Sequence, residues 1–191
     1  MRGFLPLLAG SLVMMNVPQH ASATSTQVPR SDQDRFRQTF YAEYSRQMEQ
    51  GGYYDAIKAR RGTPLPLRIF DCRGRLCLVA MTIAPKFDDA LFLVTVNEDN
   101  RVSRMTPVTP YGAAIDKAAF IGSPPRTGIV ITSRTHMGTP ARQLFELCGD
   151  TVGRQVAMIT GAGKAEAVEG DAAALTRATR ELRTLRRPIG F

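Results

Sequence analysis

The residues of this sequence best suited to do chemistry are three cysteines, Cys72, Cys77 and Cys148. Three thiols outside the cytoplasm permit one disulfide and leave one thiol over. If Gly74-Arg75 forms a two-residue hairpin loop, Cys72 and Cys77 face each other in a non-hydrogen-bonded pair, with Cα atoms roughly 4.5 Å apart. That separation is at the short end of the disulfide range. The spacing therefore favours a Cys72–Cys77 bridge, and a bridge from Cys148 to either of the two is the alternative.

The same hairpin also predicts which side of the sheet the bridge occupies. Residues two apart on a strand share a face, and the apolar residues that share the bridge's face are Phe70, Val79, Met81 and Ile83. We therefore expect the bridge on the core side. Cys-x4-Cys without a nearby histidine is poor zinc spacing, and it is not the Cys-x-x-Cys of a redox pair. A structural disulfide is the favoured interpretation.

Other catalytic patterns are weak in this sequence. Outside residues 1–23, which have the pattern of a signal peptide, a Ser-His-Asp arrangement would have to use His136. The Gly-x-Ser-x-Gly elbow of such enzymes is missing. Residues 160–164 have an incomplete phosphate-loop pattern. The acidic pairs Asp88-Asp89 and Glu98-Asp99 fall in predicted turns, where we expect solvated carboxylates. The sequence thus predicts no catalytic residue, no cofactor and no metal site, and it predicts that His136 is a loop residue.

The first 23 residues have the pattern of a secretory signal peptide. Met1-Arg2 is a positive start, an apolar run follows to Val17, and Ala21-Ser22-Ala23 supplies the small residues of a cleavage site. We expect the mature chain to begin at Thr24, in the periplasm. An N-terminal membrane anchor is the alternative, but the run of about 15 residues is shorter than the ~20 that span a bilayer. No cysteine follows the run before Cys72, so we expect no lipid anchor.

The charge of the chain bears on its partners. The formal net charge is +8, of which Arg2 of the signal contributes one, and 21 of the 25 basic residues are arginine. Outside the cytoplasm nucleic acid is not an expected target. The excess therefore favours an acidic protein surface, anionic lipid or an acidic polymer.

The N-terminal part of the mature chain predicts a short disordered lead over 24–30 and then a helix. Ser31 is a possible N-cap, and aromatic or apolar residues recur every four positions behind it before Gly51-Gly52 ends the pattern. These residues are Phe36, Phe40, Tyr44 and Met48. Such a stripe is more often a core contact than a cofactor site. A short second helix is expected over 53–61.

The middle of the chain predicts an antiparallel β-meander. β-branched and aromatic runs alternate there with Gly, Pro, Asp and Asn. The expected strands cover 67–72, 76–83, 90–96, 102–106, 128–133 and 143–148. A short crossing helix is expected over 113–120, and 151–170 is left unassigned.

The C-terminal segment 171–187 predicts an amphipathic helix ended by Pro188. Its apolar stripe at 100° per residue is Ala174, Ala178, Leu182 and Leu185. Its basic face is Arg177, Arg180, Arg183 and Arg187, which we take as candidate partner-binding residues. Residues 31–191 are thus expected to form a single α+β domain, an antiparallel β-meander flanked by an N-terminal aromatic helix and a C-terminal Arg-rich amphipathic helix.

The plan of the chain resembles the small third subunit of the membrane-bound quinoprotein–cytochrome c alcohol dehydrogenase of acetic-acid bacteria. The features that carry the resemblance are the signal peptide, the aromatic helix, the segment 70–77 and the Arg-rich tail 177–187. The resemblance implies a non-catalytic periplasmic accessory subunit that stabilises or assembles a complex for ethanol oxidation. Its partners would be a quinoprotein dehydrogenase subunit, which holds pyrroloquinoline quinone (PQQ), and a multi-haem cytochrome c subunit. Membrane association, on the periplasmic face of the inner membrane, would be indirect.

A function of a different class is a stand-alone periplasmic or surface interaction or adhesion protein. A hydrolase that acts through His136 is a third and weaker hypothesis.

Overall fold

A computed structural model describes residues 30–51, 65–84, 88–109, 113–123, 126–182 and 189–190 of the chain. The signal peptide, the lead up to residue 29 and the short helix expected over 53–61 lie outside the described residues. No helix in the described part is long and apolar enough to cross a membrane.

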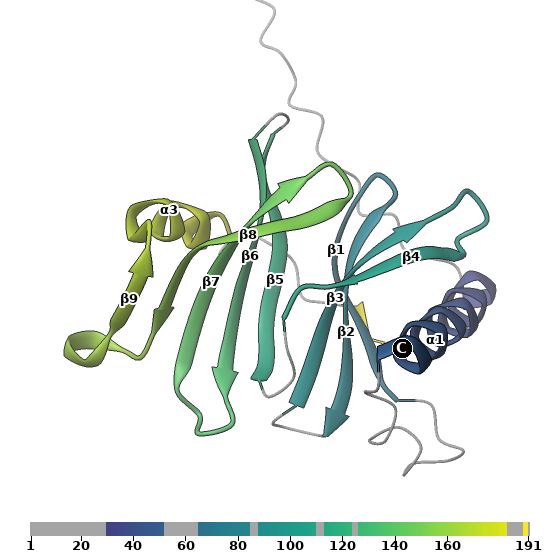
Figure 1. The fold of residues 1–191 in the computed structure, drawn as a ribbon, viewed down its shortest axis with the longest axis horizontal. Helices are drawn as coiled ribbons and strands as arrows, with labels where there is room; N and C mark the ends of the chain where they lie inside the picture. The colour runs from purple at the N-terminus through teal and green to yellow at the C-terminus, as the bar shows by residue number, and fades with distance from the viewer. Residues whose placement is uncertain are drawn as a thin grey trace, which may run out of the picture.

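The described residues form an α+β fold, as the sequence predicts, with one antiparallel sheet (Figure 1). The helices are α1 (Arg30–Gly51), the 3₁₀ turn η1 (Gly163–Ala165) and α3 (Ala172–Leu182). The strands are β1 (Leu67–Arg73), β2 (Leu76–Ala84), β3 (Asp88–Val96), β4 (Val102–Pro107), β5 (Ala113–Ser123), β6 (Arg126–Thr135), β7 (Pro140–Cys148), β8 (Thr151–Thr160), β9 (Ala167–Gly170) and β10 (Ile189–Gly190). Their order is β10-β1-β2-β3-β5-β6-β7-β8-β9, and β4 pairs with β3.

The sheet divides into two halves because β3 and β5 share only one register pair, Asp89 with Ala113. Strands β1–β4 form one half and β5–β9 the other (Figure 1). One buried cluster contains residues from both halves, for example Leu78, Leu91, Phe120 and Ile129. A second cluster joins α1 to β1–β4, and a third joins α3 to β5–β8. The layers are therefore helix, half-sheet, half-sheet and helix.

Helix α1 packs through the aromatic stripe that the sequence predicts. Phe36, Phe40 and Tyr44 are buried. The rings of Phe40 and Tyr44 both meet Phe92 of β3 edge to face, with centroids 5.7 Å apart in each pair. The side chain of Met48 lies outside the described set. The stripe is a core contact.

The predicted Cys72–Cys77 disulfide is confirmed. The two residues are opposite each other in the β1–β2 hairpin, with Cα atoms 4.1 Å apart. Gly74 in the turn has φ +59°, which a residue with a Cβ adopts at a cost. Cys148 is free and exposed, so the alternative bridges are wrong.

The expected face of Phe70 is wrong. Val79 and Met81 lie on the α1 side with Cys77, whereas Phe70 packs against the cluster between the half-sheets. The reason is a β-bulge: the register of β1 shifts between Ile69 and Asp71, which moves Phe70 to the other face.

Loss of the disulfide should destabilise the protein moderately. The bridge closes a loop with a sequence separation of 5, for which loop-closure entropy predicts about 2 kcal/mol. We expect the variant Cys72→Ser/Cys77→Ser to lose that much free energy of unfolding in urea titration followed by circular dichroism. Cys148→Ser, which removes an exposed thiol, is the matched control and should change it little. An equal loss in both variants would contradict the assignment.

One further expectation of the sequence is wrong. Residues 113–120, expected as a short helix, belong to β5. Ala118 and Phe120 of β5 face the cluster between the half-sheets, and Ala119 faces α3. A strand that is buried on both faces shows no alternation of polar and apolar residues. The unassigned segment 151–170 contains β8, η1 and β9.

Candidate functional site: a basic helix face and a charged pocket

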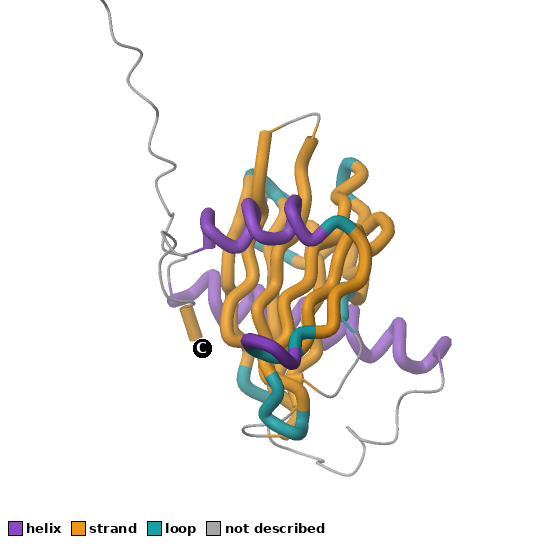
Figure 2. The backbone as a smooth tube through the Cα atoms, turned by 90° about the vertical axis from the view of Figure 1, so that its left-hand side faces the viewer, coloured by secondary structure: helices purple, strands orange, loops and turns teal. Residues whose placement is uncertain are grey.

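Helix α3 crosses the outer face of the second half-sheet (Figure 2). Its buried residues are Leu175, Ala178 and Leu182. The predicted stripe included Ala174, which is only half-buried, and omitted Leu175, which is fully buried. The packed face is thus rotated from the predicted one towards the larger side chain. Leu185 lies outside the described residues.

Both ends of α3 make hydrogen bonds with neighbouring side chains. The side chain of Asp171 accepts a hydrogen bond from the Ala174 N–H at 2.9 Å, which is an N-cap. At the other end the Lys117 ammonium of β5 donates to the Leu182 carbonyl at 3.5 Å, where a cation also suits the helix dipole. The cap stabilises the first turn of α3, and the Lys117 contact joins its last turn to β5.

Two of the four predicted partner-binding arginines, Arg177 and Arg180, are exposed on the side of α3 opposite its buried residues. Arg183 and Arg187 lie outside the described residues. In the described part, Arg177 and Arg180 have no ion pair, whereas most exposed arginines of the strands do. The arginines that pair with a carboxylate are Arg46, Arg68, Arg75, Arg104, Arg134, Arg142 and Arg154.

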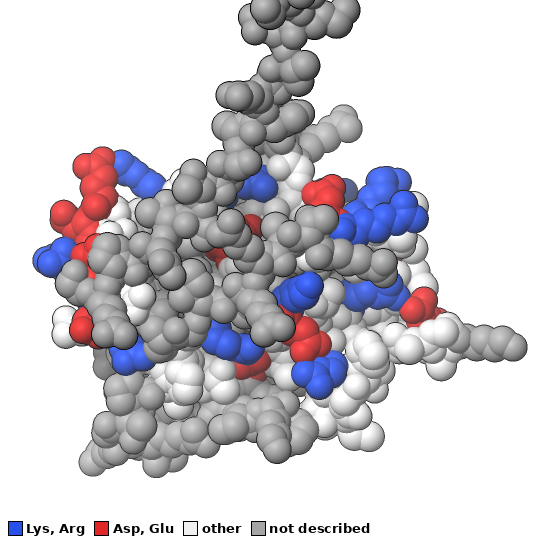
Figure 3. Space-filling view, turned by 180° about the vertical axis from the view of Figure 1, so that it is seen from behind, with Lys and Arg blue, Asp and Glu red and all other residues white. Residues whose placement is uncertain are grey.

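Where the rear face is not drawn in grey, several basic groups lie beside acidic groups (Figure 3). Paired surface charges neutralise one another and attract a charged partner weakly. On the outward side of α3, Arg177 and Arg180 have no carboxylate partner among the described residues, so their guanidinium groups have donors available for a partner.

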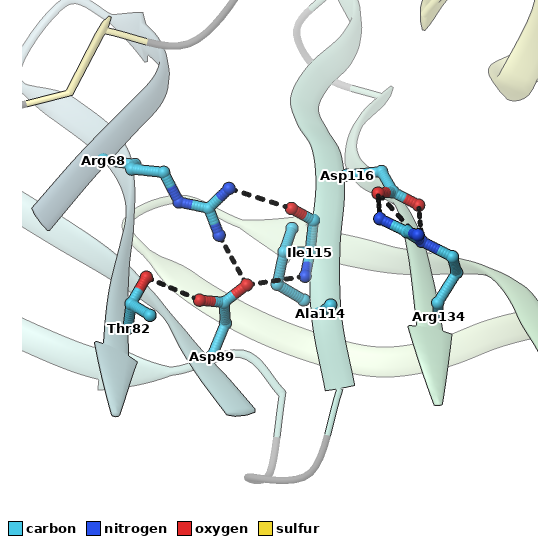
Figure 4. Close-up of a pocket in the computed structure, with 7 residues that line it drawn as sticks. All are labelled: Arg68, Thr82, Asp89, Ala114, Ile115, Asp116 and Arg134. Atoms are coloured by element: carbon cyan, nitrogen blue, oxygen red, sulfur yellow. Dashed lines mark hydrogen bonds and ion pairs between the residues drawn. The ribbon is translucent and has the colours of Figure 1, made fainter. Parts of the chain in front are cut away.

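A pocket of about 580 Å³ opens where β3 separates from β5 (Figure 4). It is lined by Arg68, Thr82, Asp89, Ala114, Ile115, Asp116 and Arg134. These residues come from five strands, β1, β2, β3, β5 and β6, in two groups that β4 separates along the chain. No short motif could have revealed the pocket.

Asp89 is the buried centre of this pocket, with 4% of its surface exposed. Its carboxylate accepts hydrogen bonds from the Thr82 hydroxyl at 2.7 Å, the Ile115 N–H at 2.8 Å and the Arg68 guanidinium. Arg68 also donates to the Ile115 carbonyl at 3.2 Å. The expectation that Asp88-Asp89 lies in a turn is wrong, because both residues begin β3. Asp89 links β1, β2, β3 and β5 at the single backbone pair between the half-sheets.

The opposite wall of the pocket carries a second, exposed ion pair. Arg134 of β6 donates to Asp116 of β5 at 2.7 Å. Asp116 is the extra residue of a β-bulge between Ile115 and Lys117. Both guanidinium groups of the pocket are therefore compensated by carboxylates, and the Thr82 hydroxyl is engaged with Asp89. This arrangement suits a structural clamp better than acid–base or nucleophilic chemistry.

The contact between the half-sheets continues along β1. Asp71 accepts a hydrogen bond from the Phe120 N–H at 3.0 Å. Arg73 donates to the carbonyls of Phe120 at 3.2 Å and Gly122 at 2.8 Å. Side chains of β1 thus satisfy main-chain groups on the edge of β5.

Stability should depend on pH through Asp71. Burial raises the pKa of this carboxyl group above its usual value of 3.8, against the lowering effects of the Phe120 N–H and Arg73. A raised pKa favours the protonated form of the carboxyl group in the folded state. The contribution of this group to the free energy of unfolding is therefore fully present below the usual pKa and is lost as pH rises through the folded pKa. We expect the unfolding free energy of the wild type, minus that of Asp71→Asn, to fall as pH rises from about 3.5 to 7. A difference that stays constant or rises over this range would contradict this.

The remaining candidate residues are separate from both features. His136 is exposed in the β6–β7 turn, as predicted, and makes no hydrogen bond or ion pair with described residues. Glu98-Asp99 lies in the β3–β4 turn, as predicted. Cys148 ends β7, at the β7–β8 turn. Within the described ranges no group of three His, Cys, Asp or Glu could hold a metal ion.

No protein-family model, curated protein or solved structure matches this chain.

Proposed function

We propose that this protein is a non-catalytic periplasmic accessory subunit that stabilises or assembles a membrane-bound oxidoreductase complex. The outward side of α3 is its contact with the complex. By the resemblance of the sequence, the partners are a quinoprotein alcohol dehydrogenase subunit and a cytochrome c subunit, and the protein reaches the inner membrane only through them.

The observation that carries the proposal is the pair Arg177 and Arg180. Both are exposed on a helix that is capped and packed, and neither has a carboxylate partner among the described residues. Arginine forms bidentate hydrogen bonds with carboxylates in partly desolvated contacts. Such a face raises the rate of association with an acidic surface and sets its register.

The disulfide supports the proposed compartment. Disulfides such as Cys72–Cys77 persist in oxidising environments and are rare in the cytoplasm. The signal-peptide pattern of residues 1–23 predicts the same location. The alternative is a stand-alone interaction or adhesion protein. It would have the same location and the same basic face, but its partner would not be an oxidoreductase.

A charge-matched comparison tests the role of α3. We expect Arg177→Gln/Arg180→Gln to reduce co-purification with the dehydrogenase and cytochrome subunits roughly tenfold at low salt, because two charge pairs are lost. Extending the change to Arg183 and Arg187 should reduce it further. The differences should shrink at 0.5 M salt, where screening already removes the interaction.

The control is Arg104→Gln/Arg154→Gln, which removes the same charge from two exposed arginines of the sheet that pair with Asp150 and Glu146. It should leave recovery unchanged. Equal recovery of the partners by both double variants at low salt would show that the α3 face is only solvated.

A further inference from the structure

Two of the sheet's edges are covered by the chain itself. Along β4, the Val102 N–H donates to the hydroxyl of Thr39 on α1 at 3.0 Å, and Gln47 of α1 donates to the Met105 carbonyl at 2.8 Å. Along β1, strand β10 pairs at Arg68 and Ile69. A covering helix or a pairing strand prevents an edge from joining another chain.

Strand β9 is not covered. It is the last strand of the sheet, with β8 on one side (Figure 1), and no described segment pairs with its other side. All four residues, Ala167 to Gly170, are exposed. The strand contains no proline, lysine or arginine, and its register with β8 has no bulge. Four of the usual protections of an edge strand, namely proline, basic charge, a bulge and a covering segment among the described residues, are therefore missing here.

The side chains of β9 add an apolar and an acidic feature. Val168 is 51% exposed and is one of two large apolar side chains exposed in the described part. Val168 is opposite Ile159, which packs towards α3, so Glu169 is on the other face. Glu169 is exposed and has no ion pair with described residues.

We propose that the free edge of β9 docks an extended strand of the partner protein, with an apolar side chain opposite Val168 and a basic side chain opposite Glu169. Addition of a strand to a sheet edge takes its affinity from main-chain hydrogen bonds and its specificity from alternate side chains. This inference rests on the proposed function, because it assigns to the same partner a second contact beside α3.

The size of the edge favours a partner that also reaches α3. Stable interfaces bury about 800 Å² on each partner, more than a four-residue strand supplies. Asp171 alone separates β9 from α3, so the adjoining surface leads to Arg177 and Arg180. A partner with an acidic surface beside its strand fits both features.

A second copy of this chain fits less well. Antiparallel pairing of two β9 strands would bring two Glu169 carboxylates close together and set two basic α3 helices on the same face of the joined sheet. Like charges in these positions oppose association.

The test uses a labelled seven-residue peptide of alternating valine and lysine, capped at both ends, with binding followed by fluorescence anisotropy. We expect saturable binding that slows amide hydrogen exchange in residues 167–170. The same peptide with alternate N-methylated amides should not bind, and the valine–glutamate analogue should bind at least about fivefold more weakly.

Val168→Lys should weaken binding of the valine–lysine peptide about tenfold or more, because a lysine on the edge repels the peptide and removes the apolar contact. The control is Met137→Lys, at the other exposed apolar side chain, which is 78% exposed in the β6–β7 turn. It should bind as the wild type does. Both sites are on the surface, and unchanged circular dichroism and melting temperature would confirm that both variants are folded.

Peptide affinity that is equal in the two lysine variants, or no binding at 1 mM, would overturn the proposal. Concentration-dependent dimerisation of the wild type that Val168→Lys abolishes would also overturn it, in favour of a second copy. Co-purification distinguishes failure of the β9 strand contact from failure of the proposed function. Recovery of the oxidoreductase by wild type and Val168→Lys alike overturns only the strand contact, and no recovery of the oxidoreductase by the wild type overturns the function.

Discussion

Replacing Asp89 with alanine should lower the free energy of unfolding by about 3 to 5 kcal/mol. The change leaves the Arg68 guanidinium next to the pocket without its carboxylate, and it removes the acceptor of the buried Ile115 N–H and the Thr82 hydroxyl. An unpaired buried polar group loses its hydration without recovering a hydrogen bond. Urea titration followed by circular dichroism is the suitable measurement, because the chain has no tryptophan.

The matched control for this variant is Asp116→Ala, on the opposite wall of the same pocket. Its ion pair with Arg134 is exposed on both sides, so we expect a loss of at most about 1 kcal/mol. If the two variants lost the same free energy, Asp89 would not be the clamp that joins the half-sheets.

Replacing Leu175 with alanine should cost about 2 to 5 kcal/mol and loosen α3 from the sheet. Leu175 is fully buried against the outer face of β5–β8, and only Ala178 and Leu182 are buried beside it in the described part of the helix. Because α3 carries Arg177 and Arg180, we expect the same variant to recover less of the partner complex.

The control for Leu175 is Thr176→Ala on the same helix. Thr176 is exposed, and its hydroxyl donates to the Ala172 carbonyl within the helix. Loss of that bond should change stability by no more than about 0.5 kcal/mol. Similar unfolding curves for the two variants would show that α3 is not held through Leu175.

Local patterns in the sequence predicted much of the fold. Strands separated by turn residues were found because alternation and turn chemistry act over a few residues. The Cys72–Cys77 bridge followed from the geometry of one hairpin, and the α1 stripe from a four-residue period. Each of these predictions depends only on residues that are close together in the sequence.

The errors occurred where distant parts of the chain decide the structure. Residues 113–120 have helix-forming alanines, yet they form β5 because both of its faces are buried. Asp89 was expected in solvent, and only contacts from β1, β2 and β5 make it a buried clamp. The predicted apolar stripe of α3 omitted Leu175, because a helical wheel does not show which side of the helix packs against the sheet.

Affinity purification from detergent-solubilised membranes shows whether this protein belongs to an oxidoreductase complex. We expect the tagged protein to recover a dehydrogenase subunit with bound PQQ and a cytochrome subunit with a c-type haem spectrum, in a fixed ratio. Arg177→Gln/Arg180→Gln should recover less of both subunits at low salt. Recovery of the protein alone, or with partners that carry neither quinone nor haem, would contradict the proposed function.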